Sequence, residues 1–261
     1  MEALARRPAL AAAGIAMAIA LASATALAAI AGRWTPVSGL SVAGWTLAGG
    51  TATALLALAF PRLFRRPDGT SLASPGLANA LTLTRLVWTA PVAVLLAGGA
   101  YGTALALYAL LLATDIVDGI VARARREVSV FGVVADPVAD VISTFAVFSV
   151  FVVDNLVPLW LYLLLAARYA MLLAGSAILT ALAGPIAYRA TVAGKIVGVV
   201  QGVGAGLIIW GAGGLQPGLA RAVFAVLGLG FASVIVSQGY IGWRHIRKTT
   251  RGRTVQGGSS R

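Results

Sequence analysis

Acidic residues are few in this chain of 261 residues, and they are concentrated in one stretch. Five of the eight Asp and Glu residues lie between positions 115 and 140. Asp115 and Asp118 are three residues apart and Asp136 and Asp140 are four apart, so each pair shares one face of a helix. Carboxylate oxygens bind hard divalent cations such as Mg²⁺, Mn²⁺ or Ca²⁺. Two such ions at one carboxylate cluster form an arrangement that catalyses displacement at phosphorus.

The residues between the two aspartate pairs are suited to binding phosphate. Gly119 follows the first pair and Gly132 precedes the second, and glycine lets a ligand approach the backbone closely. Arg123 lies between them, and guanidinium groups bind phosphate through two parallel hydrogen bonds. The pattern predicts a pocket for a diphosphate and divalent cations. The alternative interpretations are isolated helix caps, as Asp136 before Pro137 would form, and a proton relay in a transporter.

Composition indicates which class of protein holds this pocket. The chain is 59% hydrophobic and only 11% charged, whereas soluble proteins carry about 25% charged residues. This excludes a soluble enzyme, a disordered chain and a nucleic-acid-binding domain, and it predicts an all-α integral membrane protein. The lack of Cys and the single His245 exclude thiol catalysis, zinc–thiolate sites and a His-based triad.

Eight stretches are long and apolar enough to cross a bilayer, which takes about 20 residues. They are residues 8–31, 39–60, 83–100, 101–122, 133–153, 157–182, 194–213 and 218–241. The first also resembles a cleavable signal peptide, but its apolar run is longer than a signal requires, and we expect it to be retained. Most Arg and Lys residues fall on the side that holds both termini. The positive-inside rule makes that side cytoplasmic, and we expect a bacterial inner membrane protein whose site faces the cytoplasm.

A polar linker that contains Pro and Arg divides the chain. We predict a two-helix N-terminal unit with its linker, a six-helix catalytic core, and a basic, disordered cytoplasmic tail, over residues 1–75, 76–242 and 243–261. The segment Gly76–Arg85 is predicted to form a short interfacial helix that leads into the third span. Its Asn79, Thr82 and Arg85 lie at i, i+3 and i+6, near one face of that helix.

The aspartates, glycines and arginine together resemble the signature of the CDP-alcohol phosphatidyltransferase family. The matching residues are Asp115-x-x-Asp118-Gly119-x-x-Ala122-Arg123, eight further residues, and Gly132-x-x-x-Asp136-x-x-x-Asp140. At average residue usage, a chance match of these fixed positions has a probability on the order of 10⁻⁷. The resemblance covers about residues 76–242 and implies a six-helix core in a protein that is commonly a homodimer.

The resemblance also implies a reaction, in which a CDP-linked lipid, usually CDP-diacylglycerol, gives its phosphatidyl group to an alcohol and releases CMP. Mg²⁺ or Mn²⁺, as two ions, would have four ligands: Asp115, Asp118, Asp136 and Asp140. Asp140 would also act as general base on the acceptor hydroxyl. The CDP moiety would contact seven residues: Asn79, Thr82, Asp118, Gly119, Ala122, Arg123 and Gly132. The remaining partners would be membrane lipids, and no nucleic acid is expected to bind.

Basic residues beyond this signature indicate a phosphorylated acceptor. Arg168 lies inside a span, where a charged side chain is unfavourable, and Arg189 and Lys195 follow it. The residues around Lys195 resemble the branch that uses glycerol 3-phosphate, phosphatidylglycerophosphate synthase. Val141 and Val197 depart from that branch, where lysine is usual at both positions. An inositol phosphate, serine or another alcohol therefore stays open as the acceptor.

Overall fold

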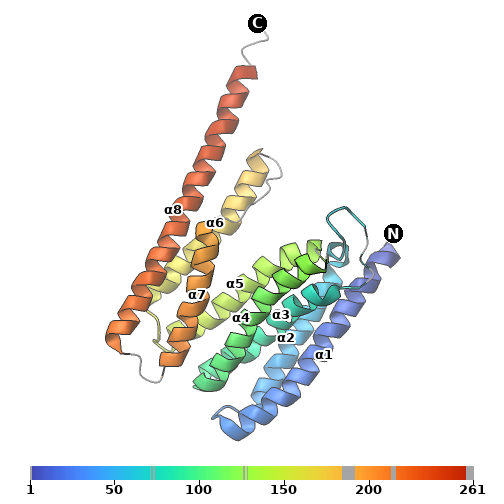
Figure 1. Ribbon diagram of the computed structural model, residues 1–261, viewed down its shortest axis with the longest axis vertical. Helices are drawn as coiled ribbons and strands as arrows, with labels where there is room; N and C mark the ends of the chain where they lie inside the picture. The colour runs from blue at the N-terminus through green and yellow to red at the C-terminus, as the bar shows by residue number, and fades with distance from the viewer. Residues whose placement is uncertain are drawn as a thin grey trace. The chain divides into compact units, whose positions relative to one another are not determined.

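The computed structural model describes residues 2–70, 72, 74–125, 127, 129–183, 192–212 and 216–256. In these residues the chain is built from α-helices joined by mostly short connections, with one 3₁₀ helix, η1 (Figure 1). The elements are α1 (Glu2–Trp34), α2 (Gly39–Ala59), η1 (Pro61–Leu63), α3 (Gly76–Ala97), α4 (Tyr101–Ala124), α5 (Val130–Val153), α6 (Leu159–Ala183), α7 (Val192–Gly211) and α8 (Pro217–Gln256).

The helices have the length and composition of membrane spans, as predicted. Within the described residues, seven segments can cross a bilayer: Arg6–Trp34, Gly39–Ala59, Gly76–Ala97, Tyr101–Ala124, Val130–Val153, Gly194–Gly211 and Pro217–Tyr240. Helix α6 contributes a shorter apolar stretch, Leu159–Ala174, and the side chains that follow it lie outside the described ones. The all-α integral membrane architecture is therefore confirmed.

Two segments differ from the sequence-based expectation. Residues 76–85 do not form a separate interfacial helix, because α3 runs without interruption from Gly76 to Ala97. Helix α8 continues to Gln256 and so enters the tail that was predicted to be disordered. Its Arg and Lys residues are good helix formers, and adding residues to an existing helix is easier than nucleating a new one.

The helices form two compact units. The first contains Met1–Asp154 with Ile209–Gly213, and the second contains Asn155–Ile208 with Gly214–Arg261. In the second unit α6 packs against α8, and glycines allow close contact. A methyl group added at Gly228 would meet the Trp160 ring at 3.0 Å, and one added at Gly204 would meet Leu227 at 3.0 Å.

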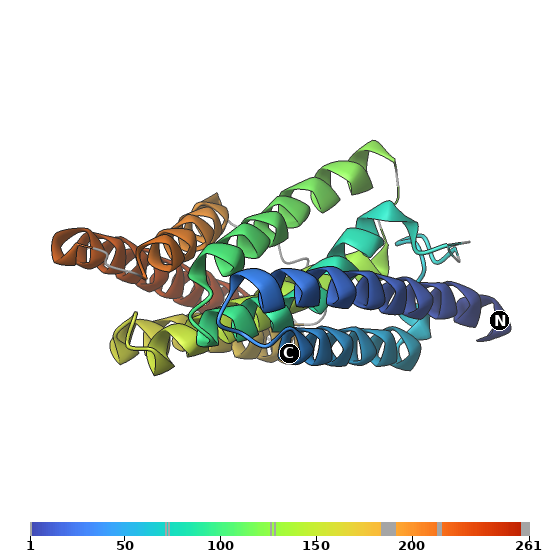
Figure 2. The ribbon, with the colours of Figure 1, turned by 90° about the horizontal axis from the view of Figure 1, so that it is seen from below.

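In the first unit, α3 is the central helix. It packs against α1, α2, α4 and α5, and half of its most apolar window is buried. Helices α1 and α2 lie side by side and cover one side of α3 (Figures 1 and 2). They approach closely because small residues meet: a methyl group added at Gly50 would collide with Ala20. The Trp88 indole N–H of α3 donates to the Ser23 hydroxyl of α1 at 2.9 Å, which ties the pair to the core.

The linker after α2 is docked onto the start of α5. The Phe64 ring stacks on the Phe131 ring with centroids 4.4 Å apart, and both rings are buried in a cluster that includes Leu83 of α3. The backbone N–H of Val130 donates to the carbonyl of Arg65 at 2.9 Å. These contacts fix the first turn of α5 relative to α3, and the predicted site residues of both helices lie close to this point.

Candidate active site

The polar face predicted for the start of α3 points into the protein. Asn79, Thr82 and Arg85 are each only 2% exposed. Thr89, one further turn along, is also buried, and its hydroxyl is 2.7 Å from the Ser143 hydroxyl of α5. Buried polar groups require partners, and α4 and α5 supply them here. The predicted shared face is therefore confirmed.

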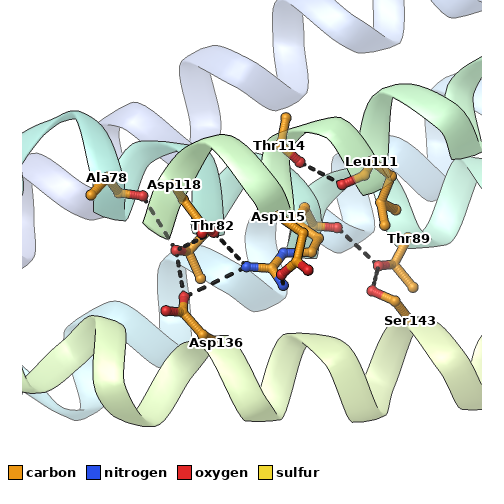
Figure 3. A network of polar contacts seen from close by, with 10 residues as sticks. Ala78, Thr82, Thr89, Leu111, Thr114, Asp115, Asp118, Asp136 and Ser143 are labelled. Carbon is orange, nitrogen blue, oxygen red and sulfur yellow. Dashed lines mark hydrogen bonds and ion pairs between the residues drawn. The ribbon is translucent and has the colours of Figure 1, made fainter. Parts of the chain in front are cut away.

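Arg85 is the centre of the polar cluster. One terminal nitrogen of its guanidinium pairs with Asp115 Oδ1, and the other lies 2.6 Å from Asp118 Oδ2 and 3.6 Å from Asp136 Oδ1. Figure 3 shows these three aspartates and Thr82 converging from three helices. The Asp118 side chain is 7% exposed, whereas those of Asp115 and Asp136 are 52% and 43% exposed. The cluster thus has one enclosed carboxylate and two that solvent can reach.

Asp115 and Asp118 meet Asp136 across α3 rather than through direct packing of α4 on α5. Among the described residues α3 packs against both helices, whereas α4 and α5 share few contacts with each other. The short basic connection at residues 123–131 would make α4 and α5 antiparallel neighbours, and the packing of the described residues corrects that expectation. The short connection does bring their ends together, but the side chains of α3 fill the space between their carboxylates.

Thr82 holds two of the aspartates together. Its hydroxyl lies 2.7 Å from Asp136 Oδ1, 3.5 Å from Asp118 Oδ2 and 3.3 Å from the carbonyl of Ala78. The single hydroxyl hydrogen can be donated to one acceptor at a time, and the shortest distance favours Asp136. Thr82 therefore orients the Asp136 carboxylate toward α3.

A second set of hydrogen bonds joins α3 to the start of α5. Ser129 is the N-cap of α5 and accepts from the Gly132 N–H at 2.9 Å. The Ser129 hydroxyl donates to Asn79 Oδ1 at 2.8 Å, and the Asn79 amide donates to the carbonyl of Pro75 at 2.6 Å. Because Ser129 caps the helix, Asp136 lies in its second turn and is not a cap, which removes the alternative interpretation of Asp136.

Glu127 caps the beginning of α3. Its Oε2 accepts from the backbone N–H groups of Leu77 at 2.9 Å and Ala78 at 3.4 Å. Gly76 has a φ of +78°, and a methyl group there would meet Glu127 Oε2 at 2.7 Å, so only glycine fits. A carboxylate at this position also interacts favourably with the positive end of the helix dipole.

These contacts surround a cavity of about 80 Å³ at one end of the helices. Its lining residues are Ala78, Asn79, Thr82, Asp118, Ala122, Glu127, Ser129, Gly132, Val133 and Asp136. Five of the seven residues predicted to contact CDP are therefore brought together here. Gly132 lies close to the polar atoms of the wall, because a methyl group on it would be 3.1 Å from Asn79 Oδ1.

The other two predicted CDP contacts lie beside this cavity on α4. Gly119 and the exposed Arg123 are one helical turn apart. A methyl group at Gly119 would meet the guanidinium of Arg123 at 3.4 Å, so that guanidinium lies back along its own helix. Glycine leaves room for it there.

Of the remaining predicted residues, Asp140 belongs to α5, and Arg168 and Lys195 belong to the second unit. Asp140 is exposed, one turn after Asp136 on α5. Arg168 is buried in the second unit, where its guanidinium pairs with Gln201 Oε1 and lies 5.0 Å and 5.6 Å from the ring centroids of Tyr169 and Phe231. Lys195 is exposed in the same unit, and the predicted acceptor residue Arg189 lies outside the described residues.

The chemistry of the three carboxylates suits a divalent cation. Three carboxylates share one guanidinium, so together they carry an excess of negative charge when ionised, and hard oxygen ligands are those that Mg²⁺ and Mn²⁺ prefer. The described part of the chain holds no group of three Asp, Glu or His side chains already arranged around one ion position. Arg85 lies among the carboxylates instead.

Three residues of the site were not among the predicted ligands: Arg85, Glu127 and Ser129. Arg85 was placed on the polar face, but nothing in the spacing indicated which carboxylates it would pair with. Glu127 carried a signal, since it is a single acid in a basic connection next to the predicted pocket. Ser129 is a typical N-cap residue directly before an apolar run, which also predicts the start of α5.

Comparison with known proteins identifies a family. The family model described as CDP-alcohol phosphatidyltransferase matches residues 76–235, which is more than half of the chain. The match includes α3, α4 and α5 and therefore the whole polar cluster. No curated protein and no solved structure shows significant similarity to the chain.

Proposed function

The chain belongs to the CDP-alcohol phosphatidyltransferase family, and from this premise we propose that it transfers the phosphatidyl group of CDP-diacylglycerol to a phosphorylated alcohol. Family membership makes it a membrane enzyme of phospholipid synthesis and decides against a transporter or proton relay. The observation that carries the proposal is the convergence of Asp115, Asp118 and Asp136 beside a cavity that two further signature residues, Ala122 and Gly132, line.

In the proposed reaction the acceptor hydroxyl attacks the phosphorus that carries diacylglycerol. A bond forms between the acceptor oxygen and this phosphorus, and the bond from phosphorus to the bridging oxygen of CMP breaks. The hydroxyl proton passes to Asp140, and CMP leaves. The exposure of Asp140, one turn from Asp136, supports this role because an incoming alcohol can reach its carboxylate.

The side chains around the cavity would bind and orient the CDP moiety. Gly119 leaves room for the Arg123 guanidinium and Gly132 for the Asn79 side chain, and Arg123 can turn from its own helix to the diphosphate. Thr82 orients Asp136, and Asn79 and Ser129 fix the start of α5. Mg²⁺ or Mn²⁺, proposed as two ions held by Asp115, Asp118, Asp136 and Asp140, would neutralise the diphosphate and the departing CMP.

We further propose glycerol 3-phosphate as the acceptor, with Arg168, Arg189 and Lys195 as its phosphate ligands. Support comes from Arg168, a buried cation whose partners include an uncharged amide and two aromatic rings. An anionic ligand would supply the countercharge that these partners lack. We also propose that the protein is a homodimer in a bacterial inner membrane. Its active site would face the cytoplasm, and the distribution of basic residues supports this orientation.

The test is an assay of the purified protein in detergent. Radiolabelled CDP-diacylglycerol is incubated with glycerol 3-phosphate, inositol phosphate, inositol or serine, and the lipid products are separated by thin-layer chromatography. We expect turnover with glycerol 3-phosphate that stops with a chelator and returns with Mg²⁺ or Mn²⁺. Asp118→Asn should abolish it, and Asp140→Asn should impair turnover more than metal binding.

The matched control is Asp154→Asn, which changes an aspartate at the opposite end of α5 and should retain activity. Full activity in chelator would refute the metal-dependent mechanism. Turnover with serine or free inositol, and none with a phosphorylated alcohol, would refute the acceptor assignment.

A further inference from the structure

Arg85 lies among three of the carboxylates that we propose as metal ligands. Its side chain is 2% exposed and pairs with all three aspartates. Its Nε has no hydrogen-bond partner among the described residues, so a buried donor is left unsatisfied in this arrangement. The unpartnered Nε is unusual for a residue that only stabilises the fold, because buried donors are nearly always paired.

The electrostatics of the cluster explain why a cation is needed there. Asp115, Asp118 and Asp136 lie within spans, where an uncompensated charge is unfavourable, and like charges brought together repel. The guanidinium of Arg85 supplies a countercharge without any bound ion. A divalent cation would supply the same countercharge, and it would use the same carboxylate oxygens.

We propose that Arg85 is an internal counter-ion of the site, which neutralises the three aspartates when no divalent cation is bound and competes with the cation for them. This inference rests on the proposed function, which supplies the metal. The two exposed carboxylates, Asp115 and Asp136, are the ones that exchange Arg85 for the ion. The enclosed Asp118 keeps its ion pair through Oδ2, and its second oxygen remains as a potential ligand.

The test compares wild-type protein with Arg85→Met in detergent, using two measurements that do not depend on turnover. Thermal unfolding is recorded in chelator and in Mn²⁺, and Mn²⁺ binding is followed by the electron paramagnetic resonance signal of the free ion. In chelator Arg85→Met should unfold at a lower temperature than wild type, because the carboxylates have lost their counter-ion. Mn²⁺ should remove most of this difference in unfolding temperature. Arg85→Met should bind Mn²⁺ at least roughly tenfold more tightly than wild type does.

Three further variants separate this effect from a general loss of packing or charge. Arg33→Met removes an exposed arginine from the end of α1 and should change neither measurement. Arg85→Lys keeps a positive charge and should give intermediate values. Arg85→Met combined with Asp115→Asn removes a negative charge as well, and it should recover stability in chelator. If Arg85→Met cannot be purified without Mn²⁺, the Lys variant and the double variant still test the inference.

The outcomes distinguish this inference from the function on which it rests. If wild-type protein binds no Mn²⁺ and is active in chelator, the proposed metal site itself is wrong. If wild-type protein binds Mn²⁺, but the Arg85 variants bind it with equal or lower affinity, Arg85 does not compete with the ion. If Arg85→Met is equally destabilised in chelator and in Mn²⁺, Arg85 has only a structural role.

Discussion

Replacing Thr82 by valine tests whether orientation of Asp136 matters to the reaction. Valine has nearly the shape of threonine but lacks the hydroxyl, which lies 2.7 Å from Asp136 Oδ1. A hydrogen bond to an ionised group contributes about 1.5–3 kcal/mol. If this free energy is lost in the transition state, kcat/KM falls by about 10- to 150-fold.

The same substitution should also alter the metal requirement. Loss of a residue that orients a metal ligand typically lowers metal affinity or activity by about 10- to 100-fold. We therefore expect Thr82→Val to need a higher Mg²⁺ concentration for half-maximal activity. Initial rates with CDP-diacylglycerol, measured over a series of Mg²⁺ concentrations, give both kcat/KM and the Mg²⁺ concentration for half-maximal activity. Thr82→Ser keeps the hydroxyl and should recover most of the activity.

Thr84→Val is the matched control for this experiment. Thr84 lies two residues away on α3, and its hydroxyl donates at 2.8 Å to the carbonyl of Ala80 within the same helix. The Thr84→Val substitution makes the same chemical change at a residue that does not contact an aspartate, so the rates of this variant should stay close to those of wild type. If Thr82→Val and Thr84→Val show the same rates and the same Mg²⁺ dependence, the role given to Thr82 is refuted.

Two further substitutions test the docking of the linker and the proposed acceptor site. Phe64→Ala should lower the free energy of unfolding in detergent by about 3–5 kcal/mol, because it empties the stack on Phe131, whereas Phe60→Ala should have little effect because Phe60 is exposed. Equal destabilisation by both would show that the linker is not held by this stack. Lys195→Ala should raise the KM for glycerol 3-phosphate far more than that for CDP-diacylglycerol, as steady-state kinetics can show, and equal increases would make Lys195 a general electrostatic element.

The sequence predicts the composition of the site better than its arrangement. The spacings of Asp115 and Asp118 and of the α3 polar residues determine helical faces, and the structure confirms that these faces turn toward one another. Spacing within a helix does not reveal which helix lies between two others. For this reason the central place of α3, and with it the ion pairs of Arg85, could not be derived from the sequence.

The linker illustrates a second limit. Residues 61–75 are polar enough to be predicted as a connection, yet Phe64 is buried against Phe131 and Leu83. A large aromatic residue in a polar segment is a signal of docking, but its partner lies more than sixty residues away in sequence. Identifying that partner requires the packing of α3 and α5, which local patterns do not contain.

The cap that Glu127 provides for α3 has a consequence for how the protein is made. The backbone N–H of Leu77 is synthesised 50 residues before the carboxylate that accepts from it. At translation rates of about 5–20 residues per second, that interval is about 3–10 s. During that interval Glu127 cannot accept from the first turn of α3. The wall that Glu127 contributes to the cavity can therefore close only after the ribosome has completed α4 and the connection beyond it.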